Sequence, residues 1–369
     1  MAFNSFILPQ KLTLCNLNKK WYDTTEGAKK TIMTGTFHTQ RFNSIQALRG
    51  FTALFVALEH VRFLNCGAFG VDIFFIISGF MAMFATHNDT KHFMKKRLIR
   101  IYPLYALLTV GTFFLLLIVP GLFHLTEANP IYLVKSLCFI PFEISPGIIQ
   151  PLVRVGWTIN YEMLFYLLFF LSFRISHKYR GLICSAFLGI LVLLVQMLPL
   201  ESTCLRFYGD FIQLEFVFGI LTYYIVRKLY QVCEEKSFTS LLSYLSIPIV
   251  LGLFIYLAIT KQHTDISGMG RVLYWGLPAL IIVLCTFIVN LKVTVPKFMT
   301  TLGNMSFSIY LLHYYPLMFI DRKIYSFESY SPKGLLFVVC GLLVVILISY
   351  ISHLLIEKKL TRYLRKFFK

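Results

Sequence analysis

The chain has 369 residues, of which 57% are hydrophobic and only 14% are charged, and its formal net charge is +18 at pH 7. Soluble domains carry about 25% charged residues, so this composition excludes an ordinary soluble enzyme and favours a chain that lies mostly in a membrane. The positive charge fits cytoplasmic loops and anionic lipid headgroups better than nucleic acid, because the sequence has no zinc-finger spacing, RNP-like motif or basic DNA-binding helix. The eight cysteines form no CxxC or Cys/His cluster, so no metal site is expected.

Residues 1–44 are polar and basic and carry no signal-peptide pattern. We expect them to form a cytoplasmic, partly disordered arm, followed by a transmembrane domain over 45–360 and a basic cytoplasmic tail over 361–369. Met33 lies shortly before the first apolar run, and a start of translation at Met33 is an alternative to the long arm.

Recurrent apolar runs predict about ten membrane-spanning helices, because each span in lipid must satisfy its own backbone hydrogen bonds. The predicted spans are 45–64, 69–86, 101–119, 157–173, 181–198, 211–226, 240–260, 271–290, 301–320 and 334–356. A further stretch, 131–145, is apolar but is interrupted by Lys135, Pro141 and Glu143. We expect a peripheral or re-entrant helix there.

The distribution of charge supports this number of spans. With ten spans and both termini in the cytoplasm, 25 Lys and Arg residues lie in inner segments and nine in outer segments, which agrees with the positive-inside rule. An eleventh span would place the basic segment 174–180 outside. The sequence therefore predicts an all-α polytopic membrane bundle, and it shows no second domain and no internal repeat.

The first predicted span contains Arg49 and His60, and ionisable residues inside a membrane are costly and commonly functional. The 11-residue spacing places both side chains within roughly 20° of one helix face and about 16 Å apart along the axis. Arg suits phosphate, and His suits taking a proton from a hydroxyl near neutral pH. Phosphates held at the inner end can thus present a thioester to a base near the outer end. Alternatively, Arg49 reaches the lipid headgroups and His60 is an interfacial residue.

Asp72 begins the second predicted span, at the depth of His60 in this topology. Its carboxylate can orient the imidazole or stabilise its charged form, although Asp72 is otherwise a helix-terminal acid. Ser78 in the same span is expected to pack against a neighbouring helix rather than to act as a nucleophile.

Arg97 and Arg100 share one helical face at the depth of Arg49. Such a cluster can bind a phosphorylated cofactor. A positive-inside signal also accounts for some of the charges in this inner loop.

Five motifs in this order resemble the integral-membrane acyltransferase-3 family, in the form seen in exopolysaccharide and O-antigen O-acetyltransferases. They are 47–50 (ALRG) with His60, 70–80 (GVDIFFIISGF), 97–103 (RLIRIYP), 157–166 (WTINYEMLFY) and 303–313 (GNMSFSIYLLH). The resemblance covers about residues 41–360, and the 40-residue arm departs from it, because the first motif usually lies near the start of the chain.

The resemblance implies transfer of an acyl group, usually acetyl, from cytoplasmic acyl-CoA to a hydroxyl of a cell-surface glycan or lipid-linked saccharide. It also implies that Arg49 and His60 are the functional pair, and that Glu162 is the acid of the fourth motif, at the outer end of a span. A multi-pass protein of the bacterial inner membrane, in contact with its lipids, is the expected setting.

Side chains beside Glu162 suit a saccharide, because sugars bind to aromatic faces together with amides and carboxylates. Trp157, Asn160 and Tyr161 are therefore the expected acceptor-binding residues. Glu162 can assist His60 or bind sugar hydroxyls, and it is otherwise a helix N-terminal acid.

Tyr310 and His313 share one face of a late predicted span and either line the same cavity or form a structural pair. Six further histidines and Glu357, which sits at the last inner boundary, are assigned no chemistry.

We expect Arg49, Arg97 and Arg100 to bind the phosphates of acyl-CoA while His60 takes the proton of the acceptor hydroxyl. Asp72 or Glu162 then stabilises the imidazolium. Direct transfer and transfer through a transient acyl-enzyme both remain open. A transporter or flippase for a saccharide or lipid is the main alternative, and a receptor-like binding bundle is another.

Overall fold

The structure of the protein is a computed structural model. It describes residues 37, 40–119, 127–199, 201–233, 238–260, 267–326 and 330–367. The arm expected over 1–44 therefore lies almost entirely outside the described residues. The basic tail expected at the C-terminus is helical as far as Phe367.

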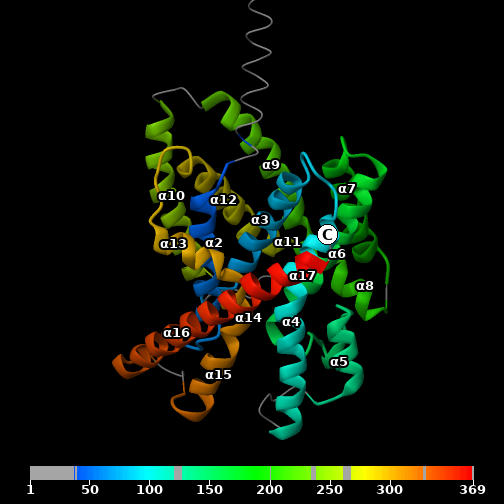
Figure 1. The fold of residues 1–369 in the computed structure, drawn as a ribbon, viewed down its shortest axis with the longest axis vertical. Coiled ribbons are helices and arrows are strands. Elements are labelled where there is room, and N and C mark those ends of the chain that lie inside the picture. Colours follow the sequence, from blue (N-terminus) through cyan, green and yellow to red (C-terminus); the bar gives the residue numbers. More distant parts are fainter. Residues whose placement is uncertain are drawn as a thin grey trace, which may run out of the picture.

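The described part of the chain is a bundle of helices with one small hairpin (Figure 1). The first half contains α2 (Asn43–Leu58), α3 (Gly70–Ala85), α4 (Phe93–Ile118), α5 (Pro130–Leu137), β1 (Glu143–Ser145), β2 (Ile148–Ile149), η1 (Arg154–Gly156), α6 (Trp157–Ile175) and α7 (Arg180–Met197). The second half contains α8 (Thr203–Tyr208), η2 (Phe211–Gln213), α9 (Leu214–Cys233), α10 (Phe238–Thr260), α11 (Gly268–Arg271), η4 (Val272–Gly276), α12 (Leu277–Val289), α13 (Lys297–Asn304), α14 (Ser306–Leu312), α15 (Tyr314–Lys323), α16 (Pro332–Ser352), η5 (His353–Leu360) and α17 (Thr361–Phe367).

Six helical runs of the described residues are long and apolar enough to cross a membrane. They are Phe93–Ile118, Arg154–Ile175, Arg180–Met197, Phe238–Thr260, Gly268–Val289 and Pro332–Lys366. The helix Gly70–Ala85 is apolar but shorter. The multi-helix membrane architecture is thus confirmed, whereas the expected number of about ten spans and the cytoplasmic position of both termini are not.

Two predicted segments differ from single continuous helices. The expected span 301–320 consists of α13, α14 and α15, with breaks at Met305 and His313. The stretch 131–145 forms the eight-residue helix α5 and the first strand of the hairpin, which pairs antiparallel with β2. Because a span needs about 20 residues, α5 is too short to cross, as expected for a peripheral helix.

Close glycine contacts fix the helices that position the site. A Cβ added to Gly79 in α3 would lie 2.3 Å from the carbonyl oxygen of Phe216 in α9, and one on Gly219 would lie 2.2 Å from that of Ile76. Small residues let helix backbones approach in this way inside membranes. In Figure 1, α2 and α3 accordingly lie near the centre, between α10 and α12 on one side and α6 and α7 on the other.

Candidate active site

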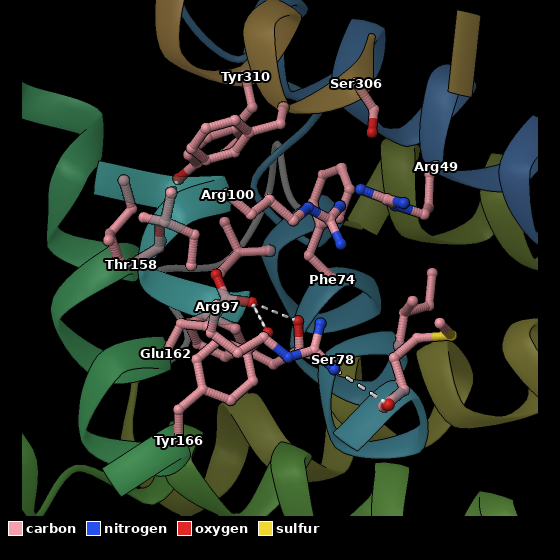
Figure 2. A pocket seen from close by; sticks show the side chains of 17 residues that line it. Arg49, Phe74, Ser78, Arg97, Arg100, Thr158, Glu162, Tyr166, Ser306 and Tyr310 are labelled. Atoms are coloured by element: carbon pink, nitrogen blue, oxygen red, sulfur yellow. Dashed lines mark hydrogen bonds between the residues drawn. The ribbon is translucent and has the colours of Figure 1, made fainter. Parts of the chain in front are cut away.

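Three arginines predicted to act together line one cavity of about 80 Å³. Arg49 comes from α2, and Arg97 and Arg100 come from the first turns of α4. Figure 2 shows the guanidinium groups of Arg49 and Arg100 side by side in this arginine cavity. Because Arg97 and Arg100 are three residues apart on one helix, they face the same way, and the structure brings them together with Arg49 in one cavity.

The arginine side chains in this cavity differ in how many protein contacts fix their positions. Arg97 is buried, donates from Nη2 to the carbonyl oxygen of Met81 at 3.1 Å, and lies over the rings of Phe93 and Tyr166 at 5.3 and 5.0 Å. Arg49 is partly buried and donates to Oε1 of Gln46 at 3.3 Å. Such fixed guanidinium groups are suited to phosphate oxygens.

Glu162 lines the arginine cavity, where its charge interacts with that of Arg49. It does not line the outer cavities that His60 lines. Its Oε1 accepts hydrogen bonds from the hydroxyls of Ser78 at 2.7 Å and Tyr166 at 2.5 Å (Figure 2). The expectation that Glu162 assists His60 at the outer end of a span is therefore not met. The reason is its place more than a full turn inside α6, which points its carboxylate toward α3.

A second carboxylate, that of Glu357, lies near the arginine cavity, and the sequence did not indicate this position. Glu357 accepts a hydrogen bond from the hydroxyl of Ser308, and its Oε2 lies 3.3 Å from Nδ1 of His353. Its charge interacts with those of Arg49 and Arg100. Glu357 lies in the π-helical segment η5, a rare geometry that is frequent at functional sites. Its closeness to the arginine cavity is seen only in the packed structure. In the sequence, the neighbouring lysines make Glu357 resemble part of a topology signal at a membrane boundary.

His60 lies in the turn that follows α2, where its backbone N–H donates to Ala57 O at 3.2 Å. It lines two further cavities, of about 370 and 320 Å³, which we call the outer cavities. The first is also lined by Glu59, Arg62, Asn65, Arg154, Tyr314, Met318, Asp321 and Arg322. The second is also lined by Val56, Glu59, Ala68, Val71, Ile149, Gln150, Arg154, Val155, Trp157, Arg271 and Tyr310. Arg49 and His60 thus line different cavities, and their spacing predicts only the separation of about 16 Å along the helix axis.

A thin partition separates the arginine cavity from the second outer cavity. Val71 and Tyr310 line both of them. The hydroxyl of Tyr310 is 2.7 Å from that of Thr158 and donates to the carbonyl oxygen of Val155 at 3.0 Å. Tyr310 is therefore a fixed wall that the donor side and the His60 side share.

The expected contact between Asp72 and His60 is not formed. Asp72 is fully buried, and its Oδ2 accepts a hydrogen bond from Nη2 of Arg271 at 2.7 Å. Arg271 also lies over the ring of Trp275 at 4.8 Å. A buried carboxylate that is committed to a guanidinium gains more from that pair than from a neutral imidazole, so Asp72 stabilises Arg271 in the wall of the second outer cavity.

Of the three residues expected to bind sugar, only Trp157 lines an outer cavity. Asn160 is 1% exposed and lines none of the three cavities. Tyr161 is buried, stacks on Phe207 at 4.2 Å and donates its hydroxyl to the carbonyl oxygen of that residue. Asn160 and Tyr161 do not line the outer cavities, because successive helical residues point in different directions.

His313 contacts His60 directly. Its ring is fully buried and stacks on that of His60, with centroids 5.1 Å apart. Nδ1 of His313 lies 3.1 Å from the carbonyl oxygen of Ile309 in the preceding turn, and Nε2 has no hydrogen-bond partner among the described residues. His313 lines none of the three cavities, and it contacts His60 from the protein side.

These contacts define what the arrangement can do. The arginine cavity can hold phosphate oxygens. The outer cavities can hold a hydroxyl compound beside an imidazole, with Trp157 and Gln150 offering an aromatic face and an amide. An imidazole that makes no hydrogen bond to the described residues is free to exchange protons with a ligand.

The sequence matches the acyltransferase-3 family, described as an acyltransferase domain, over residues 42–354. It is 32% identical over 177 residues to "Exopolysaccharide production protein ExoZ" of Rhizobium meliloti (strain 1021), a match that covers 46% of this chain and 54% of that protein. It is 27% identical over 289 residues to "Putative acetyltransferase ORF330" of Acidianus two-tailed virus, which covers 73% of this chain and 81% of that protein. No solved structure matches it. The chain belongs to the acyltransferase-3 family and is a membrane acyltransferase.

Proposed function

We propose that the protein transfers an acetyl group from acetyl-CoA, or an acyl group from another acyl-CoA, to a hydroxyl of a cell-surface or lipid-linked saccharide. The observation that carries this proposal is the pair of compartments on either side of Val71 and Tyr310. One compartment is lined by three arginines and the other by His60 and Trp157. The name of the rhizobial relative, which refers to exopolysaccharide production, supports a saccharide acceptor.

In this proposal Arg49, Arg97 and Arg100 bind the phosphates of the donor at the cytoplasmic side. The pantetheine arm extends between Val71 and Tyr310 and brings the thioester to His60. The outer cavities then face away from the cytoplasm and receive the acceptor. This orientation agrees with the excess of Lys and Arg in the predicted inner segments.

The chemical step begins when the imidazole of His60 takes the proton of the acceptor hydroxyl. The hydroxyl oxygen attacks the thioester carbonyl, the carbon–oxygen bond forms and the carbon–sulfur bond breaks. The CoA thiolate leaves and takes the proton back from His60, so the products are an ester and CoA with a free thiol. A route through an acyl-enzyme differs only in its first acceptor.

The test is an acetyl-transfer assay with purified protein in nanodiscs. Acetyl-CoA labelled in its acetyl group is supplied together with glycan from cells that lack the gene, and labelled ester on the glycan is measured by NMR. We expect the wild type to produce ester and free CoA in equal amounts. Glycan that stays unlabelled, with the saccharide instead crossing a vesicle membrane in the absence of acetyl-CoA, would favour the transporter alternative.

A further inference from the structure

The outer cavities are lined by four arginines, Arg62, Arg154, Arg271 and Arg322. All four belong to the nine Lys and Arg residues that the predicted topology places outside the cytoplasm. Outer segments are generally poor in basic residues, so a topology signal does not explain this gathering. Among the lysines predicted to lie outside, those that the structure describes, Lys135, Lys323 and Lys333, line neither cavity. A preference for arginine is typical of recognition of carboxylate or phosphate, because the guanidinium group binds both oxygens at once.

Two of these arginines are already paired with carboxylates of the protein. Arg62 forms an ion pair with Asp321 at 2.9 Å, and Arg271 forms one with Asp72 at 2.7 Å. The remaining carboxylate that lines the cavities is that of Glu59. It accepts hydrogen bonds from the backbone N–H groups of Gly67 and Ala68 at 2.9 and 3.0 Å.

Arg154 differs from the paired arginines, because it has no carboxylate partner among the residues that the structure describes. It is exposed and lines both outer cavities, as His60 does. Its Nη1 donates to the hydroxyl of Tyr314 at 3.4 Å, and its guanidinium group lies over the Tyr314 ring at 5.5 Å.

Tyr314 also packs edge-on against His60, with ring centroids 5.2 Å apart. This one ring therefore fixes the position of Arg154 relative to the imidazole. A cation held beside the proposed base, without a carboxylate partner among the described residues, is prepared to receive an anion from outside.

We propose that the acceptor is an anionic saccharide and that Arg154 binds its oxyanion, a carboxylate or a phosphate, while the reacting hydroxyl lies at His60. This inference rests on the proposed function and adds the chemical class of the acceptor. The anion comes either from a uronic acid in the saccharide or from the phosphate that joins the saccharide to a lipid carrier. Arg154 acts in both cases as a specificity-determining residue.

The experiment uses the full chain in nanodiscs, with labelled acetyl-CoA and three tetrasaccharide acceptors. The first is a neutral glucose tetramer, the second is the same tetramer with one residue oxidised to glucuronic acid, and the third is the neutral tetramer joined to a polyprenyl pyrophosphate. Variants R154Q and R154K are compared with wild type. R206Q is the matched control, because Arg206 is an exposed arginine of α8 that lines none of the three cavities.

We expect wild type and R206Q to use at least one anionic acceptor about tenfold more efficiently than the neutral one, since a hydrogen bond between charged groups is stronger than one to a neutral group. R154Q should lower kcat/KM for that acceptor to the neutral value, and R154K should keep part of the preference. A preference for the glucuronic acid tetramer assigns the anion to the sugar, and a preference for the lipid-linked tetramer alone assigns it to the phosphate.

Two results would overturn the inference and leave the proposed function standing. In the first, wild type acetylates all three tetramers equally well. In the second, R154Q keeps the preference for the anionic acceptor. Hydrolysis of acetyl-CoA without transfer to any saccharide would instead overturn the proposed function itself.

Discussion

The imidazole rings of His60 and His313 stack with centroids 5.1 Å apart and planes inclined by 29°. The contact joins the turn after α2 to the break between α14 and α15. No hydrogen bond or ion pair joins a carboxylate to His60 among the described residues, and the stack and the Tyr314 ring both help to orient its side chain. We expect catalysis to depend on the shape of residue 313 rather than on its nitrogen atoms.

The first prediction follows from this stack. His313→Phe keeps an aromatic ring of similar size and should retain most of the acetyl-transfer rate. His313→Ala removes the support and should lower kcat by roughly tenfold to a hundredfold, with KM for acetyl-CoA unchanged, because a small misplacement of a catalytic group has effects of this order. Steady-state kinetics of both variants decide the matter. If His313→Phe were as inactive as His60→Ala, the nitrogen atoms of His313 would be part of the chemistry.

The second prediction concerns the arginine cavity. Arg100 lines it without a hydrogen bond to the described residues, whereas Arg97 donates to Met81. Arg100→Gln should therefore raise KM for acetyl-CoA about tenfold, with little effect on thermal stability. Arg97→Gln should raise KM and also lower the unfolding temperature. Steady-state kinetics measure the KM for acetyl-CoA, and thermal unfolding measures the stability of each variant.

The control for both arginine variants is Lys91→Gln, since Lys91 is exposed in the same predicted inner loop and lines none of the three cavities. An equal rise in KM for the lysine variant would mean that general positive charge attracts the donor. The arginine cavity would then not be its binding site.

The third prediction separates two roles for Asp72. Its ion pair with Arg271 is buried, and removal of one partner of such a pair costs about 3–5 kcal/mol. Asp72→Asn should thus lower the unfolding temperature strongly, and the double variant Asp72→Leu with Arg271→Met should recover much of that loss. Thermal unfolding in detergent provides the measurement. An Asp72→Asn protein of normal stability but low kcat would show that Asp72 serves His60 after all.

The fourth prediction addresses the partition. If the pantetheine arm passes between Val71 and Tyr310, a larger side chain at residue 71 should block transfer without preventing donor binding. Val71→Phe should reduce kcat by at least about tenfold while the dissociation constant of CoA stays near the wild-type value. Val71→Ile, which is closer in size, is the matched control for packing. Normal turnover by Val71→Phe would require another route for the thioester.

Local sequence patterns were sufficient to predict the arginine cavity. Three-residue spacing puts Arg97 and Arg100 on one helix face, and the predicted topology places Arg49 at the same depth as that face. The separation of Arg49 and His60 along the helix axis also follows from helix geometry, whereas their placement in two different cavities was not predicted.

Contacts between distant segments could not be predicted in the same way. Asp72 pairs with Arg271, which is 199 residues away, because α11 packs near the start of α3. Glu162 meets Ser78 across 84 residues, and Glu357 meets Ser308 across 49. These partners depend on which helices become neighbours, and helical periodicity carries no information on that choice.

The most direct test of the account is an acetyl transfer across a membrane. Proteoliposomes are loaded with glycan, acetyl-CoA is supplied only outside, and the protein is oriented with its arginine cavity toward the acetyl-CoA. The account predicts ester on the enclosed glycan with wild type and R206Q, and none with His60→Ala, while acetyl-CoA itself stays outside. Ester formed by His60→Ala at the wild-type rate, or formed only when glycan and acetyl-CoA share one side, would contradict it.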